Sequence, residues 1–269
     1  MNMVRESREE NPCYEIGASS ILGGRKYQQD YGYYYTDNSQ VLGIVCDGMG
    51  GLQGGERASQ TAVETMVREF FQAKDIVSAP DFLLQAAERM NRAVLDLKDD
   101  RGKGLDAGTT LVASYFTENK MYWVSVGDSR IWLLRGEKLQ AITREHNYEA
   151  VLNMQLEQGM IDADFYEKEM SSARVDALTS FLGMERIKYV DVNKKPIELQ
   201  PGDIVALCSD GVYKSLTDSQ VYALIRDTDI DMEIAADCVT EMALRYGGRK
   251  QDNTTIILIK YLGNEGDPE

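Results

Sequence analysis

Short apolar runs, rich in β-branched and aromatic residues and bounded by Gly, Asn or Asp, recur along the chain and predict β-strands. They cover residues 14–22, 31–35, 41–46, 108–116, 121–126, 130–134, 204–208 and 254–261. Most neighbouring runs are separated by turns of only a few residues, which favours antiparallel pairing. The clearest case is a hairpin over 31–46, which turns at Asp37-Asn38-Ser39.

Two pairs of amphipathic stretches interrupt these strands. Apolar residues recur at helical spacing over 56–74, and a second helix should begin at Ser78, where Ser-Ala-Pro-Asp predicts a capping box with an early proline. The later pair covers 217–227, which opens with a Thr-x-x-Gln capping box, and 231–246, which is followed by glycine.

The order of strands, two helices, strands, two helices and a last strand lacks the regular alternation of a doubly wound sheet. It predicts an α+β layered sandwich in one domain, with a helical hairpin on each side of two mainly antiparallel sheets. We expect the domain to span 14–262, between a loose polar arm at 1–13 and a polar tail at 263–269. The irregular polar stretch 145–182 should form a flap or insertion with one or two short helices.

The balance of charge limits the partners of the chain. With 44 acidic against 29 basic side chains, the formal net charge is −15, which disfavours binding to nucleic acid or anionic membrane. Phosphate chemistry would therefore need bound cations. No apolar run approaches the length of a membrane span, and the charged N-terminus has no signal-peptide core. We expect a cytoplasmic protein that acts as a monomer.

The four cysteines are widely spaced and form no C-x-x-C pair. Cys46 and Cys208 lie inside apolar runs, where buried, unreactive thiols are the usual case. This pattern predicts a reducing compartment and argues against a disulfide framework, a zinc site and thiol-based phosphate chemistry.

One stretch, VLGIVC followed by Asp47 and a glycine-rich turn, stands out. Taken alone, Asp-Gly is usually only a turn. The glycines fit neither common nucleotide motif, because Gln53 stands where a Rossmann fingerprint needs glycine and Glu56 where a P-loop needs lysine.

The same arrangement recurs, however, since an acid adjoins a predicted buried strand at Asp47, Asp128, Asp210 and Asp252. If these strands are neighbours, each close pair of carboxylates repels by about 4 kcal/mol at an effective dielectric near 20. A shared divalent cation would remove this penalty, and carboxylates with carbonyls and water are the ligands of Mg²⁺ or Mn²⁺. A single histidine in the chain rules out a histidine-rich zinc or iron centre.

Six short motifs then carry a resemblance to a known family. In order they are Arg25…Gln29-Asp30, Asp47-Gly48-Met49-Gly50-Gly51, Gly108-Thr109-Thr110, Gly127-Asp128-Ser129-Arg130, Ser209-Asp210-Gly211 and Asp252-Asn253-x-Thr255. Together, over about 25–259, they resemble the metal-dependent, type 2C serine/threonine protein phosphatase family in its bacterial form. The resemblance implies a four-layer α-β-β-α sandwich with a two-metal centre at one end of the sheets.

The resemblance also implies roles for the matching residues. Asp47 resembles the carboxylate that bridges both metals, and Gly48 lends its backbone carbonyl to one of them. Asp210 and Asp252 resemble further ligands of the first metal, and Asp30 resembles the acid that orients metal-bound water.

Two further positions complete the implied site. Asp128 matches the residue that, with Asp210, holds a third and weaker metal in bacterial members. Arg25 matches the arginine that grips the phosphate, for which a planar bidentate donor is well suited. The implied reaction is hydrolysis of phosphoserine or phosphothreonine in proteins by direct attack of a metal-bridging hydroxide, with Mg²⁺ or Mn²⁺ as the two, or three, ions.

Two positions, Gln28 and Met49, depart from the family pattern, and a third, His146, matches it but has no obvious role. Gln28 is one methylene longer than the asparagine of bacterial relatives, and Met49 replaces a histidine that animal relatives are thought to use as a proton donor. His146 belongs to a Thr-x-Asp-His-Ser-like element, and we interpret it as structural.

Two other functions stay open from the sequence. An inactive binding module on the same scaffold is disfavoured because every carboxylate position of the family is filled. A phosphohydrolase acting on small molecules is the second alternative. For the leading interpretation, the partners are phosphorylated proteins and the opposing activity is a Ser/Thr kinase.

Overall fold

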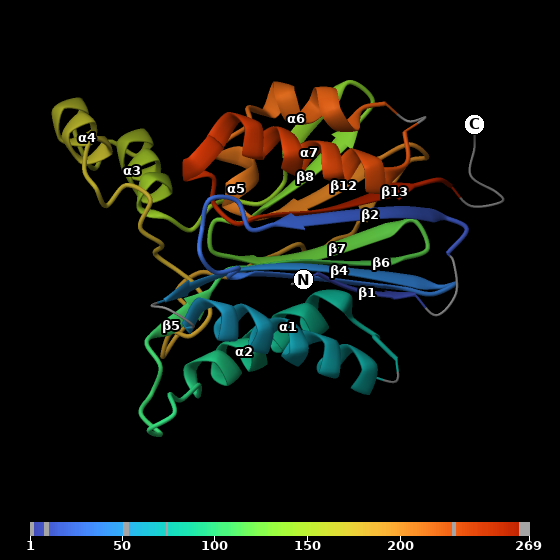
Figure 1. Cartoon of the computed structure of the whole chain (residues 1–269), viewed down its shortest axis with the longest axis horizontal. Coiled ribbons are helices and arrows are strands. Elements are labelled where there is room, and N and C mark those ends of the chain that lie inside the picture. Colours follow the sequence, from blue (N-terminus) through green and yellow to red (C-terminus); the bar gives the residue numbers. More distant parts are fainter. Residues whose placement is uncertain (1–2, 8–10, 51–53, 74, 228–229, 264–269) are drawn as a thin grey trace.

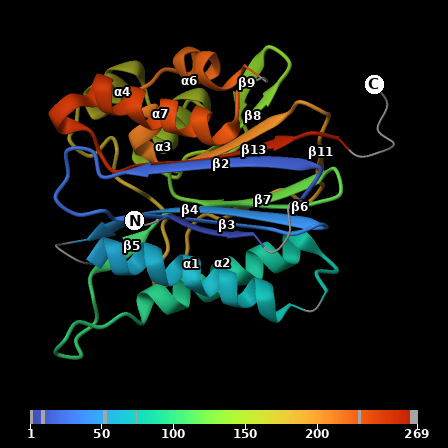
Figure 2. The same cartoon turned by 45° about the vertical axis from the view of Figure 1, so that its right-hand side comes forward.

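Two β-sheets lie face to face, and helices cover the outer face of each (Figure 1). The computed structural model describes residues 3–7, 11–50, 54–73, 75–227 and 230–263. The view turned by 45° shows the same sequence of layers, with α1 and α2 below the strands and α7 above them (Figure 2). The predicted four-layer α-β-β-α sandwich is therefore confirmed.

The first sheet contains the strands that carry Asp30 and Asp47. Its path runs β1-β3-β4-β6-β7-β10, β5 adds to β4 and β11 to β7, and only the β1–β3 pair is parallel. The strands are β1 (Met3–Ser7), β3 (Asp30–Thr36), β4 (Gln40–Gly50), β5 (Ala107–Thr109), β6 (Leu111–Thr117), β7 (Lys120–Val126), β10 (Asp191–Val192) and β11 (Ile197–Glu198).

The second sheet has the order β2-β13-β12-β8-β9, and its strands are all antiparallel. They are β2 (Tyr14–Ile21), β8 (Arg130–Arg135), β9 (Lys138–Ala141), β12 (Ile204–Cys208) and β13 (Thr254–Tyr261).

The expected hairpin over 31–46 lies in the first sheet and is confirmed, because β3 and β4 pair in antiparallel register.

The helices form three groups. One pair packs against the first sheet, a second group packs against the second sheet, and the two helices of the flap extend beyond the sandwich (Figure 1). The pair on the first sheet is α1 (Gly54–Gln72) and α2 (Ala79–Leu95). The group on the second sheet is α5 (Asp210–Tyr213), α6 (Asp218–Ile225) and α7 (Met232–Gly247), and a short 3-10 turn, η1 (Gly248–Lys250), follows α7. The flap helices are α3 (Tyr148–Glu157) and α4 (Ala163–Met170).

Burial on both faces of the strands explains why the central runs are apolar throughout. In β4, Ile44 packs toward α1 and α2, whereas Val45 packs between the sheets, because successive side chains of a strand point to opposite faces. In the second sheet, Leu258 packs toward α7 and Ile257 packs between the sheets. A strand in the middle of four layers therefore has no solvent-facing side.

Some local predictions are wrong. The strand through 41–46 continues to Gly50, so Asp47 lies inside β4 and not at its end. Part of the expected loose arm forms β1 beside β3. Ser78 makes no side-chain cap bond to α2, although the capping box at Thr217 is confirmed. The strands β10 and β11 and the helix α5 were not expected.

Other predictions fall partly outside the described residues. These include the arm at 1–2 and 8–10, the turn at 51–53, the helix end at 74 and the tail at 264–269. Within the described part of the chain, no helix is both long and apolar enough to cross a membrane.

Candidate active site

The acids singled out in the sequence meet at one end of the two sheets. In the first sheet, the register of β3 and β4 places Asp30 directly opposite Asp47. In the second sheet, β12 and β13 pair so that Cys208 lies opposite Ile256, and Asp210 and Asp252 therefore leave the sheet at the same end. Because all four acids lie at the same end of the two sheets, residues far apart in the sequence come close together.

Two hydrogen bonds join the sheets at this end. The Ser209 hydroxyl donates to Oδ2 of Asp30 at 2.7 Å, and the backbone N–H of Gln29 donates to the Asn253 side chain at 2.8 Å. The Asn253 amide also donates to the Leu22 carbonyl at 2.9 Å. These bonds fix the relative position of the two sheet ends that carry the acids.

Two threonines of the Gly-Thr-Thr motif hold Asp47. Its backbone N–H donates to Oγ1 of Thr110 at 2.9 Å, and its carbonyl accepts from the Thr109 hydroxyl, also at 2.9 Å. The Thr110 hydroxyl forms a further bond with Ser129, beside Asp128. Both polar groups of the Asp47 backbone are thus satisfied, and its side chain is left to face the other acids.

The carboxylates strongly perturb one another. Burial raises the pKa of Asp47 well above its usual range, and Asp30, Asp210, Asp128 and Asp252 raise it further by repulsion. Burial, assisted by Asp210, likewise raises the pKa of Asp30 and of Asp128 to about 7 each. Burial and Asp210 also raise the pKa of Asp252, whereas nearby Arg25 lowers it in part. Burial is the larger cause in each case, and the added repulsion agrees with the clustering of the five acids at this end of the sheets.

The donor set suits a hard cation. Asp30 is fully buried, and within the described ranges neither its Oδ1 nor Oδ1 of Asp210 has a hydrogen-bond partner. An unpaired buried carboxylate oxygen is costly unless a cation satisfies it. Oxygen donors from several carboxylates are the preferred ligands of Mg²⁺ and Mn²⁺. The residues present therefore fit the ions that the sequence implies.

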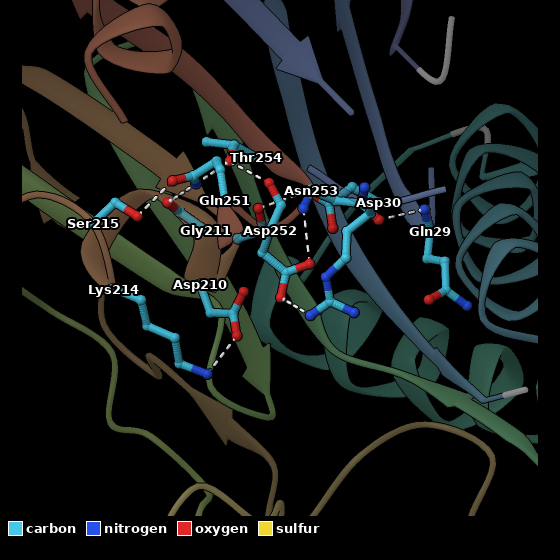
Figure 3. Close-up of polar contacts among 12 residues, drawn as sticks. Gln29, Asp30, Asp210, Gly211, Lys214, Ser215, Gln251, Asp252, Asn253 and Thr254 are labelled. Atoms are coloured by element: carbon cyan, nitrogen blue, oxygen red, sulfur yellow. Dashed lines mark hydrogen bonds and ion pairs between the residues drawn. The ribbon is translucent and has the colours of Figure 1, made fainter. Parts of the chain in front are cut away.

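Two of the acids pair with cations of the chain itself. Lys214 donates to Oδ2 of Asp210 at 2.6 Å (Figure 3), and Arg25 forms an ion pair with Asp252. Among the described residues, no group of three or more Asp, Glu, His or Cys side chains is already arranged to hold an ion. Ion binding at Asp252 therefore requires that its carboxylate rotate away from Arg25 or share an oxygen with it, whereas at Asp210 Lys214 occupies only Oδ2.

Gly48 lies where a side chain cannot fit. A Cβ at this position would clash with the backbone carbonyl of Gly55, at the start of α1, and its N–H donates to the Gln29 carbonyl at 3.0 Å. Helix α1 can approach β4 this closely because both positions are glycine. This close approach brings the first turn of α1 against the strand that carries Asp47.

The remaining positions have structural partners. Gln28 uses its extra length to donate to Ser20 and Ile21 of β2, at 3.1 and 3.0 Å. His146 is buried, accepts from the Gly127 N–H at 3.1 Å and lies 3.4 Å from Asp191, in agreement with a structural role. Burial raises the pKa of the Cys46 thiol, which is consistent with an unreactive core cysteine.

Several residues of the site were not assigned a role from the sequence. Ser209, Asn253, Thr109 and Thr110 belong to the quoted motifs, so their position in those motifs was a usable signal. Lys214 belongs to none of them. Its only signal was its place four residues after Asp210 at a predicted strand end, where a short helix brings i and i+4 side chains together.

Comparison with known proteins agrees with this arrangement. Residues 16–238 match the family model described as Protein phosphatase 2C. The chain is 27% identical over 240 residues to a serine/threonine phosphatase stp of Listeria monocytogenes, which covers 88% of this chain and 91% of that protein. The fold resembles a serine/threonine phosphatase of S. agalactiae with a TM-score of 0.78, at 24% identity over 92% of this chain and 99% of the other.

A second solved structure bears on the metal. It is the catalytic domain of the serine threonine protein phosphatase PstP in complex with two manganese ions, which matches with a TM-score of 0.72 and 25% identity over 93% of this chain and 99% of that one. Since the family model covers most of the chain, including four of the five clustered acids, this protein belongs to the protein phosphatase 2C family of metal-dependent serine/threonine phosphatases.

Proposed function

We propose that the chain removes phosphate from phosphoserine and phosphothreonine in proteins, with Mg²⁺ or Mn²⁺ held by the clustered acids. The observation that carries this proposal is the convergence of five mutually repelling carboxylates, two with unpaired buried oxygens, at one end of the sheets. Such a cluster is stable only when protons or cations neutralise it. The solved relative with two manganese ions supports the second of these states.

The proposed ligands are the carboxylates of Asp47, Asp210 and Asp252 and the backbone carbonyl of Gly48. Bound divalent ions would supply a water of lowered pKa as nucleophile and would neutralise charge on the phosphoryl oxygens. Asp47 is held through its backbone by the threonines at 109 and 110, so its carboxylate needs little reorganisation to bind.

Asp30 and Arg25 have different proposed roles. Asp30 is buried opposite Asp47, and the Ser209 hydroxyl fixes one of its oxygens, so the other can accept a hydrogen bond from the attacking water and orient it. About half of the Arg25 side chain is exposed to solvent, at 54%, which allows its guanidinium to leave Asp252 and bind two oxygens of a phosphate.

The test is hydrolysis of p-nitrophenyl phosphate and of phosphothreonine peptides with Mn²⁺, with Mg²⁺, and after chelation. Turnover should require the ion and should return when it is restored. Well-folded protein without metal-dependent turnover on either substrate would refute the proposal and leave an inactive binding module. Turnover of p-nitrophenyl phosphate and of small phosphomonoesters, with none on peptides or phosphoproteins, would instead support a small-molecule phosphohydrolase.

We place the choice of substrate in the flap at 145–182. Its base is closed by backbone bonds from Tyr148 to Ala177 and from Glu149 to Val175, while α4 buries none of its residues. Helix α3 is also anchored by Leu152, which is fully buried, so only the outer part of the flap can differ between proteins without disturbing the fold. Replacement of 158–174 by a short glycine linker, which leaves α3 in place, should spare turnover of p-nitrophenyl phosphate and alter the relative rates on phosphopeptides. Unchanged relative rates would refute this assignment.

The phosphoprotein substrates would be products of a Ser/Thr kinase, and the enzyme would act as a monomer.

A further inference from the structure

One side chain of the site, Lys214, is not explained by the proposed chemistry. It is the C-cap residue of α5, four residues after Asp210, and its ammonium is 2.6 Å from Oδ2 of Asp210. The close-up shows the ammonium of the lysine at this carboxylate (Figure 3). A cation is thus built into the chain at an acid that should bind metal.

The two oxygens of Asp210 have different surroundings. Oδ1 is buried and has no hydrogen-bond partner among the residues that the structure describes, whereas Oδ2 accepts from Lys214. One oxygen therefore remains for an ion shared with the other acids, and the second is already neutralised. If a further ion bound between Asp210 and Asp128, it would have to use this second oxygen.

Lys214 also acts on Asp128. Burial and the neighbouring Asp210 raise the pKa of Asp128 to about 7, and the positive charge of Lys214 lowers it. For Lys214, burial would lower the pKa, but Asp210 raises it overall, with support from Asp128 and from Asp176 of the flap. The ammonium thus lies in the field of the same two carboxylates that, by resemblance, would hold a third ion.

We propose that the ammonium of Lys214 takes the place of a third metal ion between Asp210 and Asp128, so that this protein works with two ions. This inference rests on the proposed metal-dependent function and specifies its ion count. A divalent ion close to an ammonium is repelled, and in a partly buried site this repulsion is much stronger than in water. The lysine therefore lowers the affinity of this position for metal while still neutralising Asp210.

Mn²⁺ binding distinguishes the alternatives without relying on turnover. The number of bound ions is measured from the signal of free Mn²⁺ in electron paramagnetic resonance, from micromolar to millimolar concentrations. The variants are Lys214→Met, which keeps length and removes charge, and Lys214→Arg, which keeps the charge. Lys103→Met, in an exposed loop, is the matched control for the loss of one positive charge.

The wild type, Lys214→Arg and Lys103→Met should bind two ions in this range. Lys214→Met should gain a third, with affinity at least about tenfold above any third site in the wild type, because the repelling charge is gone. Adding Asp128→Asn to Lys214→Met should remove that gained ion and leave two. Circular dichroism and binding of the two remaining ions show whether each variant is folded. Lys214→Gln is a second neutral variant and should behave as Lys214→Met does.

Three outcomes would overturn the inference. In the first, the wild type binds a third ion with the same affinity as Lys214→Met does. In the second, Lys214→Met and Lys214→Gln both bind only two ions. In the third, Lys214→Met gains an ion and still binds it after Asp128→Asn is added. These results are separate from a failure of the proposed function, which would appear as no Mn²⁺ binding and no metal-dependent hydrolysis by the wild type.

Discussion

Two regions of the molecule use aspartate in opposite ways. At the base of the flap, Asp191 accepts two bonds from Arg144, at 2.8 and 3.0 Å, and lies against His146. The bond with His146, assisted by Arg144, holds the pKa of Asp191 well below its usual range. At the sheet ends, one oxygen of Asp30 has no partner in the part of the chain that the structure describes, and burial raises the pKa of Asp30 to about 7.

The difference shows how to separate structural from functional acids. A carboxylate surrounded by donors has its charge neutralised by the fold, so it stabilises the protein and has no capacity left for a ligand. The clustered acids repel one another, so the fold is under electrostatic cost until a cation arrives. We therefore expect mutations in the two regions to affect activity and stability in opposite proportions.

The largest effect should follow Asp210→Asn. Loss of a ligand carboxylate should lower kcat by about a thousandfold or more, because a misplaced ion can neither activate water nor stabilise the phosphoryl group. The metal-free variant should unfold at a temperature similar to that of the metal-free wild type. The measurements are p-nitrophenyl phosphate turnover and thermal denaturation, and an active Asp210→Asn protein would show that the ligand assignment is wrong.

The second largest effect is expected for an arginine of the acid cluster, compared with an arginine at the base of the flap. Arg25→Met should lower kcat/KM by about 10- to 100-fold through lost contacts to phosphate, with the larger part in KM. Arg144→Met is the matched control, because Arg144 is also exposed and paired with an aspartate but lies at the base of the flap. It should change kcat/KM by less than about threefold, as expected for a surface ion pair. Equal losses in both variants would remove the distinction between the regions.

Asp191→Asn should show the reverse pattern. Loss of the carboxylate leaves buried His146 with a weaker partner and should lower the free energy of unfolding by about 1–3 kcal/mol. Turnover per folded molecule should stay within about threefold of the wild type, since Asp191 is not proposed to contact metal. Urea denaturation and steady-state kinetics provide the two values. A large loss of kcat at unchanged stability would place Asp191 among the functional acids.

The smallest effect concerns pH. The pKa of Asp30 and of Asp128 is about 7 in the folded chain, above the unfolded value near 4, so folding takes up protons between these limits. The stability of chelator-treated protein should therefore fall as the pH rises from about 5 to about 7. Asp191, whose pKa is lowered, contributes stability above about pH 4 and loses it only under more acidic conditions.

With Mn²⁺ in excess the trend over the same range should reverse, because the ion binds only the deprotonated acids. Thermal denaturation measures both trends, with a change of about 2–4 °C for each kcal/mol in a chain of this size. A metal-free protein that becomes more stable from about pH 5 to 7 would mean that the acids are neutralised by the chain itself.

Much of the fold was predictable because it depends on local periodicity. Apolar runs marked the central strands, and helical spacing marked α1, α2, α6 and α7, since strands and helices place side chains on one face with different repeats. The short strands β10 and β11 were missed because two residues are too few to show a pattern. The cap at Ser78 failed because a sequence shows that a hydroxyl is present but not where it points.

The amino-acid sequence by itself determined which acids, glycines and threonines could form a site, and that a cation was needed among so many negative charges. Only the tertiary structure decided how they meet. The bond between Ser209 and Asp30 joins residues 179 positions apart, and β4 continues past Asp47 because the next three residues, 48–50, pair with β5. Lys214 acquires its meaning in the same way, because its effect depends on which carboxylates the folded sheets place around its charge, and charges act through space regardless of their order in the chain.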